Sequence, residues 1–285
     1  MSFLVSVVLP LALAFIMFSL GVGLSAKDFA RVGQRPTAFL VGALNQMILL
    51  PVVAYFVVIA FGLTKEIAVG VMILAACPGG VTSNVIARMG KADVALSVSL
   101  TAVISLLGVL TIPLILGLSM SVFMGQDAPD ISIVETALKT FAITVVPIVI
   151  GLTCKHVFPD AMARAEPALS KLAIALFALI VIAALAANWS LFTTNVWLLG
   201  PALLTLLLIL TLFGFVVPRL LGRTRNESKT VSIETGVQNA ALGIAIAGGL
   251  TVSDGISAYA LPAAVYGPLM YLIVLPVIFI YRRMD

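Results

Sequence analysis

Two short polar stretches govern how this chain folds: Pro78-Gly79-Gly80-Val81-Thr82-Ser83-Asn84 and Glu234-Thr235-Gly236-Val237-Gln238-Asn239. Each one interrupts a long apolar segment with glycine and with side-chain oxygen atoms. A helix that faces lipid gains nothing from such residues, because a polar group left unsatisfied in the hydrocarbon core costs several kcal/mol. Paired interruptions in two separate segments therefore indicate a place where something polar binds inside a membrane.

The composition places the whole chain in a membrane. Of its 285 residues, 62% are hydrophobic and 10% are charged, whereas soluble domains carry about 25% charged residues. The mean hydropathy of +1.22 excludes a soluble domain and predicts a polytopic protein in a lipid bilayer. The net charge of +4 comes from basic residues in short loops, without a basic stripe interleaved with aromatic residues. We therefore expect no nucleic-acid partner, and nothing in the sequence points to an obligate protein partner.

Apolar segments long enough to span a bilayer alternate with short charged loops. A helical span needs ~20 mostly apolar residues, and none of these segments shows the period of two that is typical of β-barrel strands. The sequence therefore predicts an all-α membrane protein with nine transmembrane helices. Their expected bounds are 3–24, 37–62, 67–89, 93–119, 133–155, 168–188, 196–219, 229–251 and 256–281.

The basic residues orient these predicted spans. Every Lys and Arg except Lys65 and Lys139 falls on the same side of the nine-span arrangement. By the positive-inside rule that side is cytoplasmic. We therefore expect the N-terminus outside and the C-terminus inside, which requires an odd number of spans. The expected location is the inner (plasma) membrane of a bacterium.

The two halves of the chain have matching layouts. Spans one to four and spans six to nine both carry their polar interruption in the third span, at 67–89 and at 229–251. The first set starts outside and the second starts inside, so the arrangement predicts an inverted-topology repeat. Broken helices in matching positions of two inverted halves indicate the binding site of a transporter.

The first interruption is expected to break its helix. Pro78 lacks an N–H group and clashes with the preceding turn, and the two glycines that follow permit positive φ angles and close approach of another segment. The polar run Thr82-Ser83-Asn84 comes next. A kink with Ser and Thr bonded back to the helix explains three successive polar residues less well than a binding site does.

The second interruption contributes a carboxylate. Glu234 lies five residues past Lys229 of the seventh loop, ~7–8 Å at helical rise, so spacing alone would allow a position near the inner headgroups. The polar run that continues to Asn239 favours a deeper one. A buried carboxylate needs a cation or a proton, and no Lys or Arg lies deep in a predicted span. The residues leave the choice between a bound hard cation and a proton open.

Other side chains extend the supply of oxygen atoms. Gln46 lies in the second span, and Ser97 and Thr101 are four residues apart on one face of the fourth. Hard alkali cations prefer such ligands, whereas the chain has no cluster of histidine or cysteine. Half-helix N-termini at the breaks would also attract an anion. The combination predicts coupled uptake of an organic anion with a cation, and the lack of a nucleophile–base pair argues against an enzyme.

At these residues the chain resembles the bile acid:sodium symporter family, over essentially its whole length. The resemblance rests on three ordered motifs: Cys77-Pro78-Gly79-Gly80 leading into Ser83-Asn84, Asp93-Val94-Ala95-Leu96-Ser97 with Thr101, and Glu234-x-Gly236-x-Gln238-Asn239. It implies a panel domain, here about 1–30 and 130–190, and a core domain, about 37–125 and 196–285. Two discontinuous helices would cross in the core. Bacterial relatives often have ten spans, and this chain resembles the nine-span branch.

The resemblance also implies two sodium ions and their ligands. The first sodium site would consist of Ser83, Asn84, Ser97, Thr101 and Glu234. The second would consist of Gln46, Glu234 and Gln238, with backbone carbonyls near Thr235 and Val237. Asn239 corresponds to a family residue that faces substrate, and we expect the nearby Thr82 to join it.

The expected activity is sodium-coupled symport of an organic anion by alternating access. Some bile-salt-binding relatives carry a His-Asn pair in the last helix, where this chain has Gly267-Pro268. The substrate is therefore either a bile salt or a smaller carboxylate, such as a pantoate-like or keto acid. The alternative is a proton-coupled carboxylate transporter that uses Glu234.

Overall fold

All regular secondary structure in the described residues (7–34, 36–129, 132–250 and 257–284) of the computed structural model is helical. The prediction of an all-α fold is confirmed. The helices are α1 (Leu9–Gly23), α2 (Ala26–Gln34), α3 (Pro36–Leu44), η2 (Asn45–Leu49), α4 (Leu50–Ala60), α5 (Lys65–Ala76), α6 (Val81–Met89), α7 (Val94–Phe123), η3 (Gly125–Asp127), α8 (Ile133–Thr140), η4 (Phe141–Val145), α9 (Val146–Val157), α10 (Pro159–Ala187), α11 (Trp189–Leu220), α12 (Arg225–Gly236), α13 (Ala240–Gly248), η5 (Ala258–Ala260) and α14 (Leu261–Arg282).

Several of these helices are suited to cross a membrane, so the chain is an integral membrane protein. The pair α5 and α6 passes the test of length and hydropathy as one span, with a bend of 61°. Six unbroken segments pass it within the described residues: Pro36–Ala60, Val94–Phe123, Ile133–Val157, Pro159–Ala187, Trp189–Leu220 and Ala258–Arg282.

The count of nine spans stays a prediction. The first and eighth predicted spans correspond to α1 and to the pair α12–α13, and neither passes the same test within the described residues. The expected segments 3–24, 229–251 and 256–281 also extend into residues that lie outside the described part of the chain.

Three predicted loops are helical in the structure. α10 begins at Pro159 and α11 begins at Trp189, so most of the expected fifth loop and nearly all of the sixth loop, at 188–195, belong to helices. The first loop forms α2. Polar and charged residues end an apolar span, but Ala, Leu, Glu, Lys and Arg remain good helix formers, and proline is favoured at a helix start. The helices therefore extend beyond the ends of the apolar segments.

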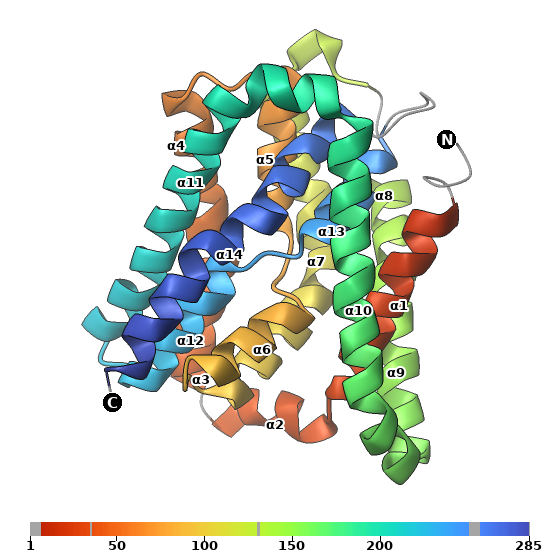
Figure 1. Ribbon diagram of the computed structural model, residues 1–285, viewed down its shortest axis with the longest axis vertical. Helices are drawn as coiled ribbons and strands as arrows, with labels where there is room; N and C mark the ends of the chain where they lie inside the picture. The colour runs from red at the N-terminus through yellow and green to blue at the C-terminus, as the bar shows by residue number, and fades with distance from the viewer. Residues whose placement is uncertain (1–6, 35, 130–131, 251–256, 285) are drawn as a thin grey trace.

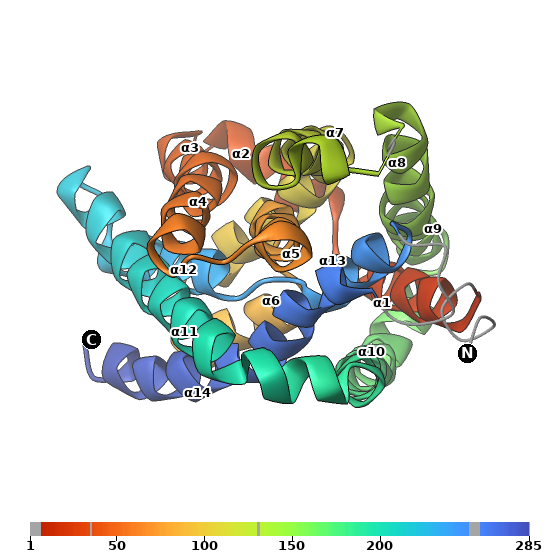
Figure 2. The same cartoon turned by 90° about the horizontal axis from the view of Figure 1, so that it is seen from above.

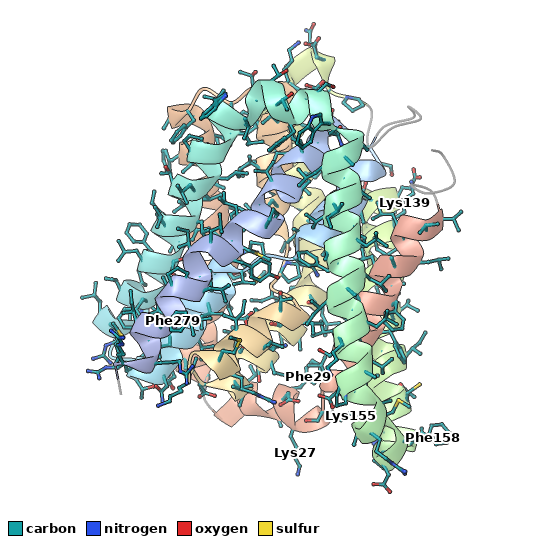
Figure 3. All side chains as sticks on the ribbon, viewed as in Figure 1. Lys27, Phe29, Lys139, Lys155, Phe158 and Phe279 are labelled. Atoms are coloured by element: carbon teal, nitrogen blue, oxygen red, sulfur yellow. The ribbon has the colours of Figure 1, made fainter. Side chains whose placement is uncertain are left out.

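The helices run between two opposite ends of the molecule (Figure 1). α1 begins near the upper end, and α14 ends near the lower end. The broken pair α5–α6 descends along the chain, whereas α12–α13 ascends, so the two interrupted elements run in opposite directions. Lys27 and Lys155 lie toward the lower end, and Lys139 lies toward the upper one (Figure 3).

α1, α9 and α10 form one packed group. α1 approaches α9 closely because both helices carry glycine at the contact. A Cβ atom on Gly21 would collide with the main chain of Ile148, and one on Gly151 would collide with the main chain of Phe18. Small residues of this kind allow membrane helices to pack backbone against backbone.

The interrupted helices occupy the interior. Seen from above, α5, α6 and α13 lie in the centre and the other helices surround them (Figure 2). α12 is polar in sequence, yet every residue from Glu227 to Gly236 is buried. A capping box between Thr224 and Glu227 starts this helix at Arg225. The expected position of Lys229 in a loop is therefore wrong: it lies in the second turn of α12 and is fully buried.

Candidate cation and substrate site at the crossing of two broken helices

The two breaks meet inside the molecule. Residues 77–80 separate α5 from α6, and residues 237–239 separate α12 from α13. The backbone N–H of Asn239 donates to the carbonyl oxygen of Pro78, with 2.9 Å between nitrogen and oxygen. A main-chain hydrogen bond thus joins two segments that are 161 positions apart in the sequence numbering (239 − 78).

The Glu234 carboxylate lies beside this crossing and accepts hydrogen bonds from α7. Thr101 Oγ1 donates to Glu234 Oε2 at 2.8 Å, and the hydroxyl of Ser97 donates to Oε1. The glutamate is only 3% exposed. Among the described residues, no Lys or Arg forms an ion pair with it. A buried carboxylate without a protein cation requires a bound cation or a proton.

α6 adds two more oxygen atoms to the same cluster. Ser97 Oγ lies 2.8 Å from Asn84 Oδ1, and Ser83 Oγ lies 3.4 Å from Thr101 Oγ1. The structure therefore brings together the five side chains predicted for the first sodium site. They come from α6, α7 and α12, and all of their nearest polar atoms in the cluster are oxygens. This donor set suits a hard cation.

Local features of the sequence place these oxygen atoms. The side chain of Asp93 accepts a hydrogen bond from the backbone N–H of Leu96 at 3.1 Å, which caps α7 at its first turn. Ser97 and Thr101 then follow four residues apart, so their hydroxyls point to the same side. The Asp93 main-chain oxygen also accepts from Thr230 at 2.9 Å, which joins the start of α7 to α12.

Gly79 provides the space for the carboxylate. A Cβ atom on Gly79 would lie 2.6 Å from Glu234 Oε2 and 3.0 Å from Ser83 Oγ. Neither Gly79 nor Gly80 has a positive φ, so that part of the expectation is wrong, and the glycine at position 79 is required for close approach alone. The break therefore forms one wall of the oxygen cluster.

The residues predicted for a second sodium ion also lie together. Gln46 Nε2 donates to Gln238 Oε1 at 2.8 Å and to the carbonyl oxygen of Cys77 at 3.0 Å. Gln238 Nε2 donates to the carbonyl oxygen of Thr235 at 2.8 Å. Gln46 Oε1 is buried, and no hydrogen-bond partner for it lies in the described part of the chain. The Nε2 group of Gln46 lies between two acceptors, the carbonyl oxygen of Cys77 and Oε1 of Gln238. A cation at the position of this Nε2 group would contact the same two oxygen atoms, and Gln46 Oε1 could be a further ligand.

The π-helical turn η2 positions Gln46. This turn (Asn45–Leu49) interrupts the helical segment just before Pro51, and such turns are frequent at functional sites. Val237, the remaining predicted ligand, is fully buried in the second break. Its backbone N–H donates to the carbonyl oxygen of Ile233 at 2.8 Å.

The two predicted substrate residues lie on the side of the crossing that faces α10. Thr82 and Asn239 line a small cavity together with Phe177 of α10 and Ile16 of α1. The side-chain oxygen of Asn239 caps α13, because it accepts from the backbone N–H of Leu242 at 3.0 Å. Its amide group is therefore the part available to a ligand.

A larger cavity of about 310 Å³ adjoins the first. It lies between α1 and α10 on one side and α6 and α7 on the other, and Val81 lines both cavities. Asn84 and Arg88 line it from α6, and Glu166 lines it from α10. Reasoning from the sequence missed Arg88 because, at the end of the predicted span 67–89, it counted only as a charge that orients the spans.

The sequence comparisons agree with this geometry. A family model described as "Sodium Bile acid symporter family" matches residues 10–195. The chain belongs to this family. The sodium bile acid symporter resemblance read from the motifs is thereby confirmed.

Individual relatives in this family come from bacteria, animals and plants. The chain is 31% identical over 249 residues to the "Uncharacterized sodium-dependent transporter YocS" of Bacillus subtilis (strain 168), covering 85% of this chain and 74% of that protein. It is 32% identical over 250 residues to the ileal sodium/bile acid cotransporter of Homo sapiens, covering 85% and 69%. It is 27% identical over 253 residues to the probable sodium/metabolite cotransporter BASS1, chloroplastic, of Arabidopsis thaliana, covering 89% and 61%.

Proposed function

We propose that this protein is a sodium-coupled symporter that carries an organic anion across a bacterial inner membrane. The observation that supports this most directly is the buried Glu234 carboxylate among the hydroxyl and amide oxygens of three helices. A proton relay would not need so many neutral oxygen ligands. Sodium supplies the positive charge that the site lacks and holds α6, α7 and α12 together.

Two sodium ions are proposed. The first binds in the cluster around Glu234, and the second binds between Gln46, Gln238 and the carbonyl oxygens of the second break. Two sodium ions with a monovalent anion move one net charge inward, which is worth ~2.3 kcal/mol per 100 mV of membrane potential. For a monoanion the membrane potential would then add to the sodium gradient in driving uptake, whereas a dianion carried with two sodium ions would move no net charge.

The substrate would bind on the α10 side of the crossing, next to Thr82 and Asn239. Alternating access would move the panel (1–30 and 130–190) against the core (37–125 and 196–285). The packing of α1, α9 and α10 on one another supports this division, as does the cavity that separates α1 and α10 from α6 and α7. The proposed topology has nine spans with the N-terminus outside and the C-terminus inside. Both a bile salt and a smaller carboxylate are candidate substrates, and the smaller carboxylate is at least as good a candidate because this chain has Gly267-Pro268 where some bile-salt-binding relatives carry a His-Asn pair.

Uptake into proteoliposomes tests the coupling. With a panel of radiolabelled organic acids, we expect an inward sodium gradient to drive accumulation and a potassium gradient not to do so. Glu234→Ala should abolish the sodium dependence, because it removes the charge that the cation neutralises. Glu135→Ala is the control, since that carboxylate is exposed and paired with Lys139 at 2.7 Å.

The outcomes separate the two coupling ions. Equal uptake with and without a sodium gradient would reject sodium coupling. Flux that follows a pH gradient and ignores sodium would favour the proton-coupled alternative at the same carboxylate.

A further inference from the structure

The geometry points to Arg88 as the residue that selects an organic dianion, by binding a second acidic group of the substrate in the 310 Å³ cavity next to the crossing. This inference rests on the proposed symport function and narrows the class of substrate. It assigns one anionic end of the substrate to the broken-helix crossing and the other to the guanidinium of Arg88.

The first observation is the placement of Arg88 on α6. Val81, Asn84, Val85 and Arg88 all line the cavity, and their spacing of three and four residues makes them one face of the helix. The face therefore runs from the break, at Val81, past the proposed sodium ligand Asn84, to Arg88. Because long helical side chains tend to lean toward the N-terminus of their helix, we expect the guanidinium of Arg88 to lean toward Asn84 and the crossing.

The second observation is the charge balance in the cavity. Among the described residues, its lining holds one basic residue, Arg88, and one acidic residue, Glu166. Glu166 is paired with Lys155 at 3.4 Å, and Lys155 also approaches the carbonyl oxygen of Gly23 at 3.4 Å. In contrast, no described residue forms a hydrogen bond or ion pair with the Arg88 side chain. Within the described part of the chain, the cavity therefore presents one cation whose charge no other residue offsets.

The third observation is the chemistry of the remaining lining. Ser19 of α1 and Ser170 of α10 supply hydroxyl groups, and Val94 and Val98 of α7 supply an apolar wall. A volume of about 310 Å³ lies at the lower end of the range for small-molecule sites. The space suits a short chain of carbon atoms with an acidic group at each end. Arginine recognises a carboxylate or phosphate through two parallel hydrogen bonds, which explains why this position would discriminate by charge.

An ordinary role for Arg88 is to orient the span and to interact with the C-terminal end of α6. That role needs a positive charge at the membrane edge, but it does not need the charge to line a cavity shared with Asn84. The two roles make different predictions, because a purely orienting charge has no effect on which substrate binds.

The experiment compares pairs of ligands that differ by one charge. Purified protein in saturating sodium is titrated with succinate, glutarate and adipate, and with the monoamide of each, and binding is followed by thermal shift. We expect at least one dicarboxylate to bind at least about tenfold more tightly than its monoamide. Arg88→Gln should abolish that preference by weakening the dicarboxylate alone, and Arg88→Lys should retain part of it.

Lys27→Gln is the matched control. It removes one positive charge at the same end of the molecule, but Lys27 points away from the helices (Figure 3) and does not line the cavity. This variant should keep the wild-type preference. The shift caused by sodium alone serves as the test of folding and of the sodium site in every variant.

Two results would overturn the inference: no dicarboxylate preferred to its monoamide, or an Arg88→Gln variant that weakens both members of a pair equally. Failure of the symport proposal is a different result, namely the loss of any sodium-induced shift or sodium-driven uptake in the wild-type protein.

Discussion

Gly79 and Glu234 are complementary at the level of single residues. The carboxylate occupies the space that a side chain at position 79 would fill, and the hydroxyls of Ser97 and Thr101 hold it there. The fit couples the backbone of the first break to the charge contributed by the second. A small side chain introduced at position 79 should therefore change the affinity for sodium.

Substitution of the two adjacent glycines tests this fit. Gly79→Ala places a methyl group 2.6 Å from Glu234 Oε2, whereas the nearest atom to a Cβ on Gly80 is Asn239 Nδ2, at 3.8 Å. We expect Gly79→Ala to weaken sodium binding at least about tenfold, or about 1.4 kcal/mol, and Gly80→Ala to have little effect. The measurement is the sodium concentration at half-maximal thermal shift. Equal effects of the two variants would contradict the proposed contact.

Much of the candidate site could be predicted from residue types and spacing. The four-residue interval between Ser97 and Thr101 and the polar runs at both breaks indicated a supply of oxygen ligands for a buried Glu234, whereas the set of five ligands was expected from the family resemblance. The sequence could not reveal that Gly79 serves close approach rather than a positive φ, since glycine permits both. It also could not reveal Arg88, because a basic residue at the end of a span is ordinary until the neighbouring helices enclose a cavity beside it.

α12 is the unusual element of the fold. Its residues are polar, yet Glu227 to Gly236 are all buried, because α11, α7, α6 and α14 pack around it. Its last residue is also tied to α14: the hydroxyl of Tyr266 donates to the carbonyl oxygen of Gly236 at 2.8 Å. This hydrogen bond satisfies a carbonyl group that the break leaves without a helical partner.

Removal of that hydroxyl should destabilise the end of α12. Tyr266→Phe leaves the Gly236 carbonyl buried and unsatisfied, at a cost of about 1–3 kcal/mol, without opening a large cavity. We expect a lower unfolding temperature in detergent and a weaker stabilisation by sodium. Tyr55→Phe is the control, since the contacts of the Tyr55 side chain are with the rings of Phe56 and Phe123. An unchanged unfolding temperature in Tyr266→Phe would show that the hydrogen bond is dispensable.

Helix boundaries were the weakest part of the prediction at this scale. Charged and polar residues marked the ends of apolar spans, but α10 starts nine residues before the expected position 168 and α11 starts at Trp189. Hydropathy reports which residues contact lipid, whereas helix formation depends on backbone hydrogen bonds that continue into water. Lys229 shows that a charged residue can also lie inside the protein. Its charge suggested a loop, but it belongs to α12 and is fully buried.

For the whole molecule, the direction of the two broken elements matters most. α5–α6 and α12–α13 run in opposite directions (Figure 1), and their breaks meet at one place. An inverted arrangement gives both sides of the membrane equivalent access to the crossing after a rigid movement of one part against the other. The sidedness of the chain is therefore central to the proposed mechanism.

Cysteine labelling tests the sidedness. In a background with Cys77 and Cys154 replaced by alanine, single cysteines are introduced as Lys27→Cys, Asp127→Cys and Arg283→Cys. The proposed topology predicts that a membrane-impermeant maleimide labels Asp127→Cys in intact cells, and labels the other two only in inside-out vesicles. Labelling of Lys27→Cys and Asp127→Cys from one side would contradict an odd number of crossings between them.

The bond between Asn239 and Pro78 has a consequence for how such proteins diversify. Both partners are main-chain atoms, so any residue other than proline at position 239 can make it. The side chain at position 239, which is proposed to contact the substrate, could therefore change during evolution while the main-chain bond between the two broken helices is kept. A new substrate specificity could then arise by a single substitution, without an intermediate variant in which the two broken helices fail to pack.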